Sequence, residues 1–152
     1  MLKKIFYTLI IVIFIASVYS GQSAKDISLP DLESQFAEQT DLNSMKKCTD
    51  KELLKFIGLD HSTCSEYLYY KGTDALSVSE LLVAEISSKS NLQAARDLVD
   101  SRISSQIKTF DSYGPSQVAM LKNALIIQKG QYIFYYVGEN GSKFEEVFRN
   151  AI

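Results

Sequence analysis

The stretch from Ser90 to Val137 constrains the fold of this chain more than any other. Apolar residues recur at helical spacing between Leu92 and Phe110, which predicts a long helix with one buried face. Ser90 and Gln93 have the spacing of a capping box, so we expect them to begin this helix. The corner Tyr113-Gly114-Pro115 then ends it, and Pro115 begins a second, shorter helix.

Two pairs of strands are expected around these helices. The segments 124–128 and 132–137 are apolar or aromatic, and Gly130-Gln131 between them fits a two-residue type II′ turn. The aromatic segment 67–71 predicts an earlier strand. Residues 80–87 suit either a strand or a helix, because periodicity does not decide short apolar runs. We choose a strand, since it pairs with 67–71.

Three shorter helices complete the expected elements. Pro30 begins one near 31–39, followed by an irregular connection through residue 47. Thr49 and Glu52 form a capping box before an apolar face, and Gly58 supplies the left-handed exit. Ser142 and Glu145 have the same spacing ahead of the last helix.

The element order is therefore α-α-ββ-α-α-ββ-α. We predict an α+β fold: a two-layer domain with a four-stranded antiparallel sheet and helices on one face, which would bury both sets of apolar stripes. The expected organisation is a signal peptide at residues 1–20, an N-terminal arm with a short helix at 21–47, and the α+β domain at 48–152.

The first twenty residues predict export. Lys3 and Lys4 precede an apolar run from Ile5 to about Val18, and small or tolerated residues lie before Gly21. The run is shorter than the roughly 20 residues of a membrane-spanning helix, so cleavage is favoured over an uncleaved anchor. We expect an extracytoplasmic protein, secreted or associated with the cell envelope, that would touch the membrane only through an uncleaved leader.

Cys48 and Cys64 are the only cysteines. Export permits a disulfide between them, which would stabilise the fold by about 3 kcal/mol. Two free thiols are the alternative. His61 lies three residues before Cys64, but a Cys–His nucleophile needs a fold that brings the side chains together and a third group that orients them.

Charge and motifs argue against several function classes. Outside Lys3 and Lys4, 14 basic residues face 18 acidic ones, and no basic stripe with interleaved aromatics predicts nucleic-acid binding. The sequence has no phosphate loop, metal signature or nucleophile elbow. His61, the single histidine, is expected in a turn or at the surface. We therefore predict no catalytic residue, no cofactor, no metal, and a protein that is not an enzyme.

The aromatic strands offer a candidate binding surface. If helices cover one face of the sheet, tyrosines of the other face are exposed and suit protein partners or cell-wall glycans. Simple cross-strand packing is the alternative. Arg102 and Tyr113 either frame a small cleft with the hairpin, or the corner only sets the helix angle. The candidate surface comprises Tyr67, Tyr69, Tyr132, Phe134 and Tyr136; the structural corner comprises Tyr113, Gly114 and Pro115.

Several motifs occur in a familiar order. They are Glu80-Leu81-Leu82-Val83, Arg102, Gln106, the segment 110–115, Leu121-Lys122-Asn123-Ala124 and Lys129-Gly130-Gln131-Tyr132. From about residue 31 to 148 the chain resembles an uncharacterised family of exported proteins and lipoproteins of Gram-positive bacteria, the domain of unknown function 4358. The resemblance implies an extracytoplasmic location and supplies no activity. Many relatives resemble lipoproteins, whereas this chain has no lipid-accepting cysteine.

We therefore expect a non-catalytic binding or interaction module at the cell envelope, with an unknown protein or cell-wall partner. The alternatives are a structural accessory subunit of an envelope complex and an enzyme of unrecognised class.

Overall fold

The computed structural model describes residues 6–13 and 26–152. Residues 6–13 are helical and exposed. Lys3, Lys4 and the expected cleavage site before Gly21 lie outside the described residues. Within the described ranges, no helix has the length and apolar character needed to cross a membrane.

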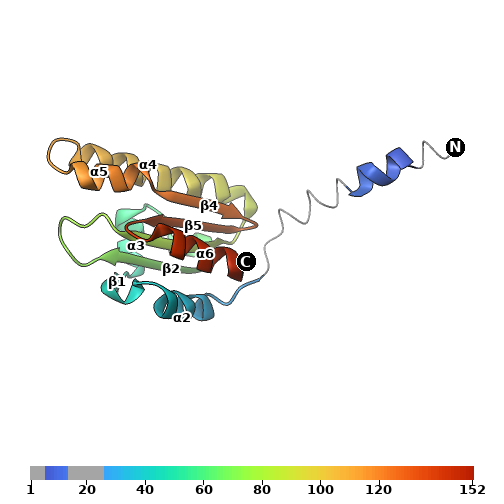
Figure 1. Cartoon of the computed structure of the whole chain (residues 1–152), viewed down its shortest axis with the longest axis horizontal. Coiled ribbons are helices and arrows are strands. Elements are labelled where there is room, and N and C mark those ends of the chain that lie inside the picture. Colours follow the sequence, from blue (N-terminus) through green and yellow to red (C-terminus); the bar gives the residue numbers. More distant parts are fainter. Residues whose placement is uncertain (1–5, 14–25) are drawn as a thin grey trace.

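The domain alternates short strands with helices (Figure 1). The strands are β1 (Met45–Lys47), β2 (Cys64–Gly72), β3 (Glu80–Ile86), β4 (Leu125–Lys129) and β5 (Tyr132–Val137). The helices are α2 (Leu29–Gln39), α3 (Asp50–Phe56), α4 (Leu92–Phe110), α5 (Pro115–Lys122) and α6 (Gly141–Ala151), with 3₁₀ turns at Leu42–Ser44, His61–Thr63 and Lys89–Asn91.

The described strands form one antiparallel sheet in the order β1-β2-β3-β5-β4. Both expected hairpins are present, and the choice of a strand at 80–87 is confirmed. The prediction of four strands is wrong, because β1 adds a fifth beside β2. This strand has only three residues, two of them exposed lysines, so it has no hydrophobic alternation that would reveal it.

Helices cover both faces of the sheet, so the predicted two-layer arrangement is wrong. In Figure 1, α6 lies in front of the sheet and α3, drawn fainter, lies behind it. One core joins the sheet to α3, α4 and α5, and a second core joins its other face to α2 and α6. The segment expected as an N-terminal arm thus contributes α2 and β1 to the fold.

Two local predictions about helix starts and turns are confirmed. Thr49 and Glu52 form the capping box of α3. Gly130 has φ +60 and Gln131 lacks positive φ, as the first and second residues of a type II′ turn require.

Two expected capping boxes are wrong. Helix α4 begins after Asn91, which makes no side-chain cap hydrogen bond, while the Ser90 hydroxyl contacts that of Ser88 at 2.8 Å. Helix α6 begins after Asn140, whose left-handed backbone, with φ +58, turns the chain before Ser142 is reached.

Candidate functional site

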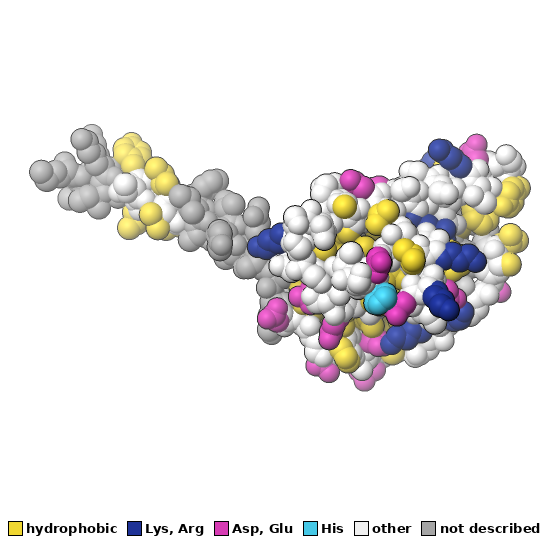
Figure 2. Space-filling model, turned by 180° about the vertical axis from the view of Figure 1, so that it is seen from behind, with side chains coloured by type: hydrophobic (Ala, Val, Ile, Leu, Met, Phe, Trp, Pro, Cys, Tyr) yellow, Lys and Arg dark blue, Asp and Glu magenta, His cyan; other side chains and the backbone are white. Residues whose placement is uncertain are grey.

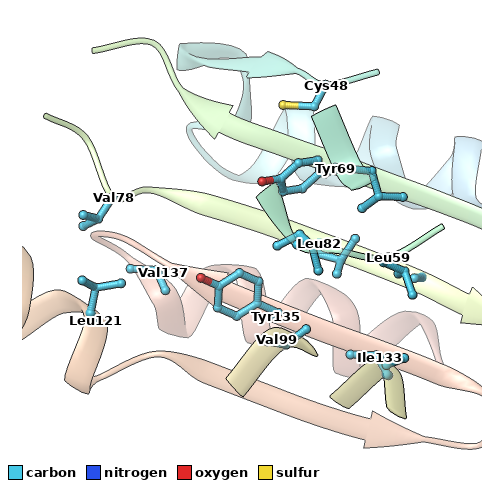
Figure 3. Close-up of a cluster of buried hydrophobic side chains, with 14 of the residues drawn as sticks. Cys48, Leu59, Tyr69, Val78, Leu82, Val99, Leu121, Ile133, Tyr135 and Val137 are labelled. Atoms are coloured by element: carbon cyan, nitrogen blue, oxygen red, sulfur yellow. The ribbon is translucent and has the colours of Figure 1, made fainter. Parts of the chain in front are cut away.

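A buried carboxylate lies where three strands and one helix meet. Glu80 begins β3 and is fully buried. The register places Lys71 of β2 directly opposite it, and Tyr69 and Tyr135 lie on the same face of the neighbouring strands. Figure 3 shows the hydroxyls of Tyr69 and Tyr135 pointing toward the same end of the sheet. One face of α4 adds Arg102 from above this end.

Both oxygens of the Glu80 carboxylate accept hydrogen bonds from neighbouring side chains. Its Oε1 lies 2.6 Å from Lys71 Nζ, 2.5 Å from Arg102 Nη2 and 3.3 Å from the Tyr69 hydroxyl. Its Oε2 accepts from Arg102 Nε at 3.2 Å and from the Tyr135 hydroxyl at 3.1 Å. The arginine contact is therefore bidentate, the strongest geometry for such a pair.

Gln106, one helical turn after Arg102, completes the cluster. It is buried, and its amide lies against both members of the ion pair. With its oxygen turned toward Arg102, the amide accepts from Nη2 at 2.6 Å and from Nε at 3.1 Å. Gln106 and Glu80 therefore contact the same two nitrogens of the guanidinium and hold its plane in place together. We call Glu80, Lys71, Arg102, Gln106, Tyr69 and Tyr135 the Glu80 cluster.

The electrostatics of the cluster keep Glu80 charged. Burial alone would raise the pKa of Glu80, but the hydrogen bonds and charges of Arg102 and Lys71 outweigh it and hold the pKa below its usual value. Burial, followed by the charge of Glu80, raises the pKa of both tyrosines far above the usual range. Both hydroxyls therefore remain protonated and act as donors.

The cations of the cluster also surround Phe56, the last residue of α3. Lys71 Nζ lies 4.4 Å from the centroid of this half-buried ring, and Arg102 Cζ lies 5.4 Å from it. Lys55 Nζ approaches to 5.3 Å from the solvent side of α3. Figure 2, which views the molecule from behind, shows Lys and Arg side chains gathered on one half of this face with hydrophobic side chains among them.

The residues expected to form an exposed aromatic surface are mostly buried. Tyr69, Tyr132, Phe134 and Tyr136 are each 3% exposed or less, and only Tyr67 is half-buried. The expectation required an open sheet face, but Tyr132, Phe134 and Tyr136 lie under α2 and α6, and Tyr69 lies on the other face under α3, α4 and α5. The hydroxyls still reach polar groups: Tyr67 donates to Asp50, and Tyr136 donates to the Glu139 carbonyl at 2.5 Å.

Cys48 and Cys64 are free thiols, which contradicts the predicted disulfide. The Cys48 amide donates to the Tyr69 carbonyl at 2.8 Å, so Cys48 lies beside Tyr69. Cys64 lies five residues before Tyr69 on β2, so at about 3.3 Å per residue it is roughly 16 Å from Tyr69 and from Cys48 beside it. A disulfide requires Cα atoms within about 7 Å.

His61, Cys64 and Tyr67 line a hollow of about 370 Å³ between α2 and the start of β2. His61 is exposed, as expected, and its Nδ1 lies 3.6 Å from Asp60 Oδ1. Burial raises the pKa of Cys64, and burial raises that of Cys48 to about 11. Neither thiol has the lowered pKa of a nucleophilic cysteine.

The corner residues are structural. Gly114 is the N-cap of α5 and Pro115 its first residue. Tyr113 is 61% exposed, with its ring 5.4 Å from that of Phe110. Because Arg102 points to Glu80, it frames no cleft with Tyr113.

The Glu80 cluster was not assembled by sequence reasoning. Glu80, Arg102 and Gln106 all belong to the motifs that carry the family resemblance, which was the available signal. The sequence pattern places Lys71 and Tyr135 only on strands and Tyr69 on a candidate exposed surface, because nothing local links them to a glutamate or an arginine far along the chain.

Comparison with known proteins identifies one family. Searches of curated proteins and of solved structures gave no match. The model of the family described as Domain of unknown function (DUF4358) matches residues 38–138, which cover β1 to β5 and the whole Glu80 cluster. The chain therefore belongs to the DUF4358 family.

Proposed function

We propose that this protein is a non-catalytic binding module that works outside the cytoplasm, at the cell envelope. One observation carries the proposal: the carboxylate oxygens of the Glu80 cluster are bound by donors inside the protein, while its two cations stay partly exposed. Both Glu80 oxygens are occupied by protein donors, whereas Lys71 and Arg102 keep part of their side chains at the surface.

This arrangement suits binding better than proton transfer. A general base needs a lone pair within reach of the substrate, and the lone pairs of Glu80 are directed at cations and hydroxyls inside the protein. The raised pKa of each thiol leaves little thiolate at neutral pH. Among the described residues, no group of three or more His, Cys, Asp or Glu side chains is placed to hold a metal.

The proposed location rests on the N-terminal pattern. Lys3 and Lys4 precede an apolar run, as in a secretory signal peptide. The apolar side chains of residues 6–13 are exposed, so they belong to neither core. An exported protein of this size without catalytic groups would act through a partner, either a protein or a cell-wall component.

Binding to isolated cell envelopes tests the proposal. We expect the labelled full chain to be retained saturably, displaced by unlabelled chain, and weakened as salt shortens the screening length from about 8 Å to about 3 Å. Envelopes stripped of protein and envelopes stripped of wall polymer separate the two classes of partner. Retention that never saturates, or turnover in a broad substrate panel, would overturn the proposal.

The second candidate is an accessory subunit of an envelope complex, and the unequal edges of the sheet favour it. Edge strand β1 has three residues and exposes Lys46 and Lys47, which discourage strand addition. Edge strand β4 has five residues, and Leu125, Ile126 and Ile127 are all partly exposed. Its outer side has no neighbouring strand in the described chain, so it could pair with an extended segment of a partner protein.

Substitution at this edge tests the second candidate. Gln128→Pro removes one outward amide donor of the edge, and Gln128→Lys adds a charge at the same position without removing a donor. Loss of a co-purifying protein in both variants, with an unchanged circular dichroism spectrum, supports the accessory role. Retention of the partner in both excludes β4 as the contact.

A further inference from the structure

We propose that the cations around Phe56 form a binding site for a phosphate monoester group. We call this site, made by Lys55, Phe56, Lys71 and Arg102, the Phe56 site. The inference rests on the proposed function, because it names the chemistry that the binding module recognises. It begins from the charge that the Glu80 cluster leaves unbalanced.

The Phe56 site contains more positive charge than its surroundings neutralise. Three cations lie within 5.4 Å of the centroid of one ring, and among the described residues Glu80 is the single carboxylate in an ion pair with any of them. Three cations and one carboxylate leave a formal charge of +2. Because Lys71 and Arg102 are largely buried, water screens this charge less than it would on an open surface.

The nearest acidic side chains of α3 are bound elsewhere. Glu52 accepts from Lys46 at 2.7 Å and closes the capping box with Thr49. Asp50 accepts from the Tyr67 hydroxyl. Within the described part of the chain, Lys55 forms no ion pair. The excess positive charge therefore has no internal counterion in the described chain.

Unused donors of the site reach solvent. Arg102 directs Nε and Nη2 at Glu80, and Nη1 has no partner among the described residues. Lys71 makes one hydrogen bond, to Glu80, and keeps two further N–H groups. In the described chain no buried side-chain nitrogen or oxygen lacks a partner, so Arg102 Nη1, which has none, is accessible. The side chains of Arg102 and Lys71 are 16% and 19% exposed.

These donors define the ligand chemistry. The Nη1 group of Arg102 and two ammonium groups, from three different elements, suit an oxyanion with several acceptor oxygens. A phosphate monoester carries close to two negative charges at neutral pH, which matches the +2 of the site. Glu80 lies behind the cations and repels a deeper anion, so the group would bind at the surface.

The same phosphate could belong to a soluble molecule or to a lipid headgroup. Titration with inorganic phosphate and sedimentation with vesicles of phosphatidic acid in phosphatidylcholine distinguish these sources. Pure phosphatidylcholine vesicles control for insertion of apolar residues 6–13. Saturable binding of free phosphate indicates a soluble ligand, and binding to phosphatidic acid vesicles alone indicates a headgroup.

A matched pair of variants tests the site itself. Lys55→Gln removes the exposed cation at Phe56, and Lys51→Gln removes another exposed cation one turn earlier on α3. We expect Lys55→Gln to weaken phosphate binding about tenfold, since a charged hydrogen bond is worth about 1.5 kcal/mol or more. Lys51→Gln should change it by less than about twofold. Arg102→Lys, which keeps the charge, should weaken binding while Glu80 stays paired.

Equal effects of the two lysine variants, or no saturable binding in either assay, would overturn the phosphate site. If the full chain nevertheless binds envelopes saturably, the binding module stands and only its ligand class is wrong. If both phosphate and envelopes fail to bind, the proposed function fails as well.

Discussion

The two faces of the sheet are buried to similar degrees but by different chemistry. The face under α3, α4 and α5 surrounds Glu80 with cations and hydroxyls. The face under α2 and α6 contains stacked rings: Tyr136 lies 4.1 Å from Phe144, and Phe134 lies 4.8 Å from Phe148. A single sheet thus carries one apolar face that encloses a charged cluster and another that is packed with aromatic rings.

The difference follows from where each face keeps its polar atoms. On the aromatic face, tyrosine hydroxyls reach the rim: Tyr70 donates to Glu33, and Tyr136 to the Glu139 carbonyl. On the charged face, the carboxylate is inside and the cations extend outward along their aliphatic stems. The stability of the aromatic face therefore depends on how its rings pack, whereas that of the charged face also depends on pairing between opposite charges.

The largest effect is expected from Glu80→Gln. It leaves Lys71 and Arg102 partly buried without their counterion, and removing one member of a buried pair costs about 3–5 kcal/mol. Urea denaturation followed by circular dichroism measures the loss. Glu85→Gln, half-exposed at the other end of the same strand, is the control and should change stability by about 0.5 kcal/mol or less. An equal loss of stability in both variants would contradict the special role of Glu80.

Phe144→Leu tests the aromatic face. The ring of Phe144 stacks on Tyr136 and lies 5.6 Å from that of Phe36. Losing two ring contacts, each worth about 0.5–1.5 kcal/mol, should lower the free energy of unfolding by about 2 kcal/mol. The loss should be the same from neutral to acidic pH, because no titrating group is removed. A strongly pH-dependent loss would contradict the division between the faces.

The charged face should respond to acid. The folded pKa of Glu80 is lowered, so its stabilisation is fully present above the pKa of an unfolded glutamate and is lost as pH falls through the folded value. The stability difference between the unsubstituted chain and Glu80→Gln should therefore shrink with acidification. Urea titrations at a series of pH values measure it. A difference that stays constant would show that Glu80 does not titrate with a lowered pKa.

The smallest effect is expected at the cysteines, both of which border the charged face. Thiol titration of the denatured, unreduced chain should find two thiols, because β2 keeps Cys48 and Cys64 roughly 16 Å apart. A reductant should leave the thermal midpoint unchanged. Absence of reactive thiols would mean that the fold differs at β1 or β2.

Elements with long or regular patterns were predictable. The helix 92–110 repeats its apolar positions over five turns, and the turn at Gly130 has its own chemistry. Strand β1 was not predicted, because three residues are too few to show the alternation of apolar and polar side chains that indicates a strand. The capping boxes predicted at Ser90 and Ser142 are absent, because this spacing caps a helix only where the serine is the N-cap residue. Asn91 and Asn140 occupy the N-cap position instead.

Local pattern was enough to establish an α+β chain with two hairpins, a fixed helix corner and an export-like start. It did not establish which faces are covered, since an amphipathic helix has one apolar stripe whichever side of a sheet it packs on. Glu80 appears in the sequence as an ordinary strand-edge charge. Only the packed structure brings Lys71, Arg102 and two tyrosines to it from separate segments, because burial and charge pairing depend on contacts between residues far apart in the chain.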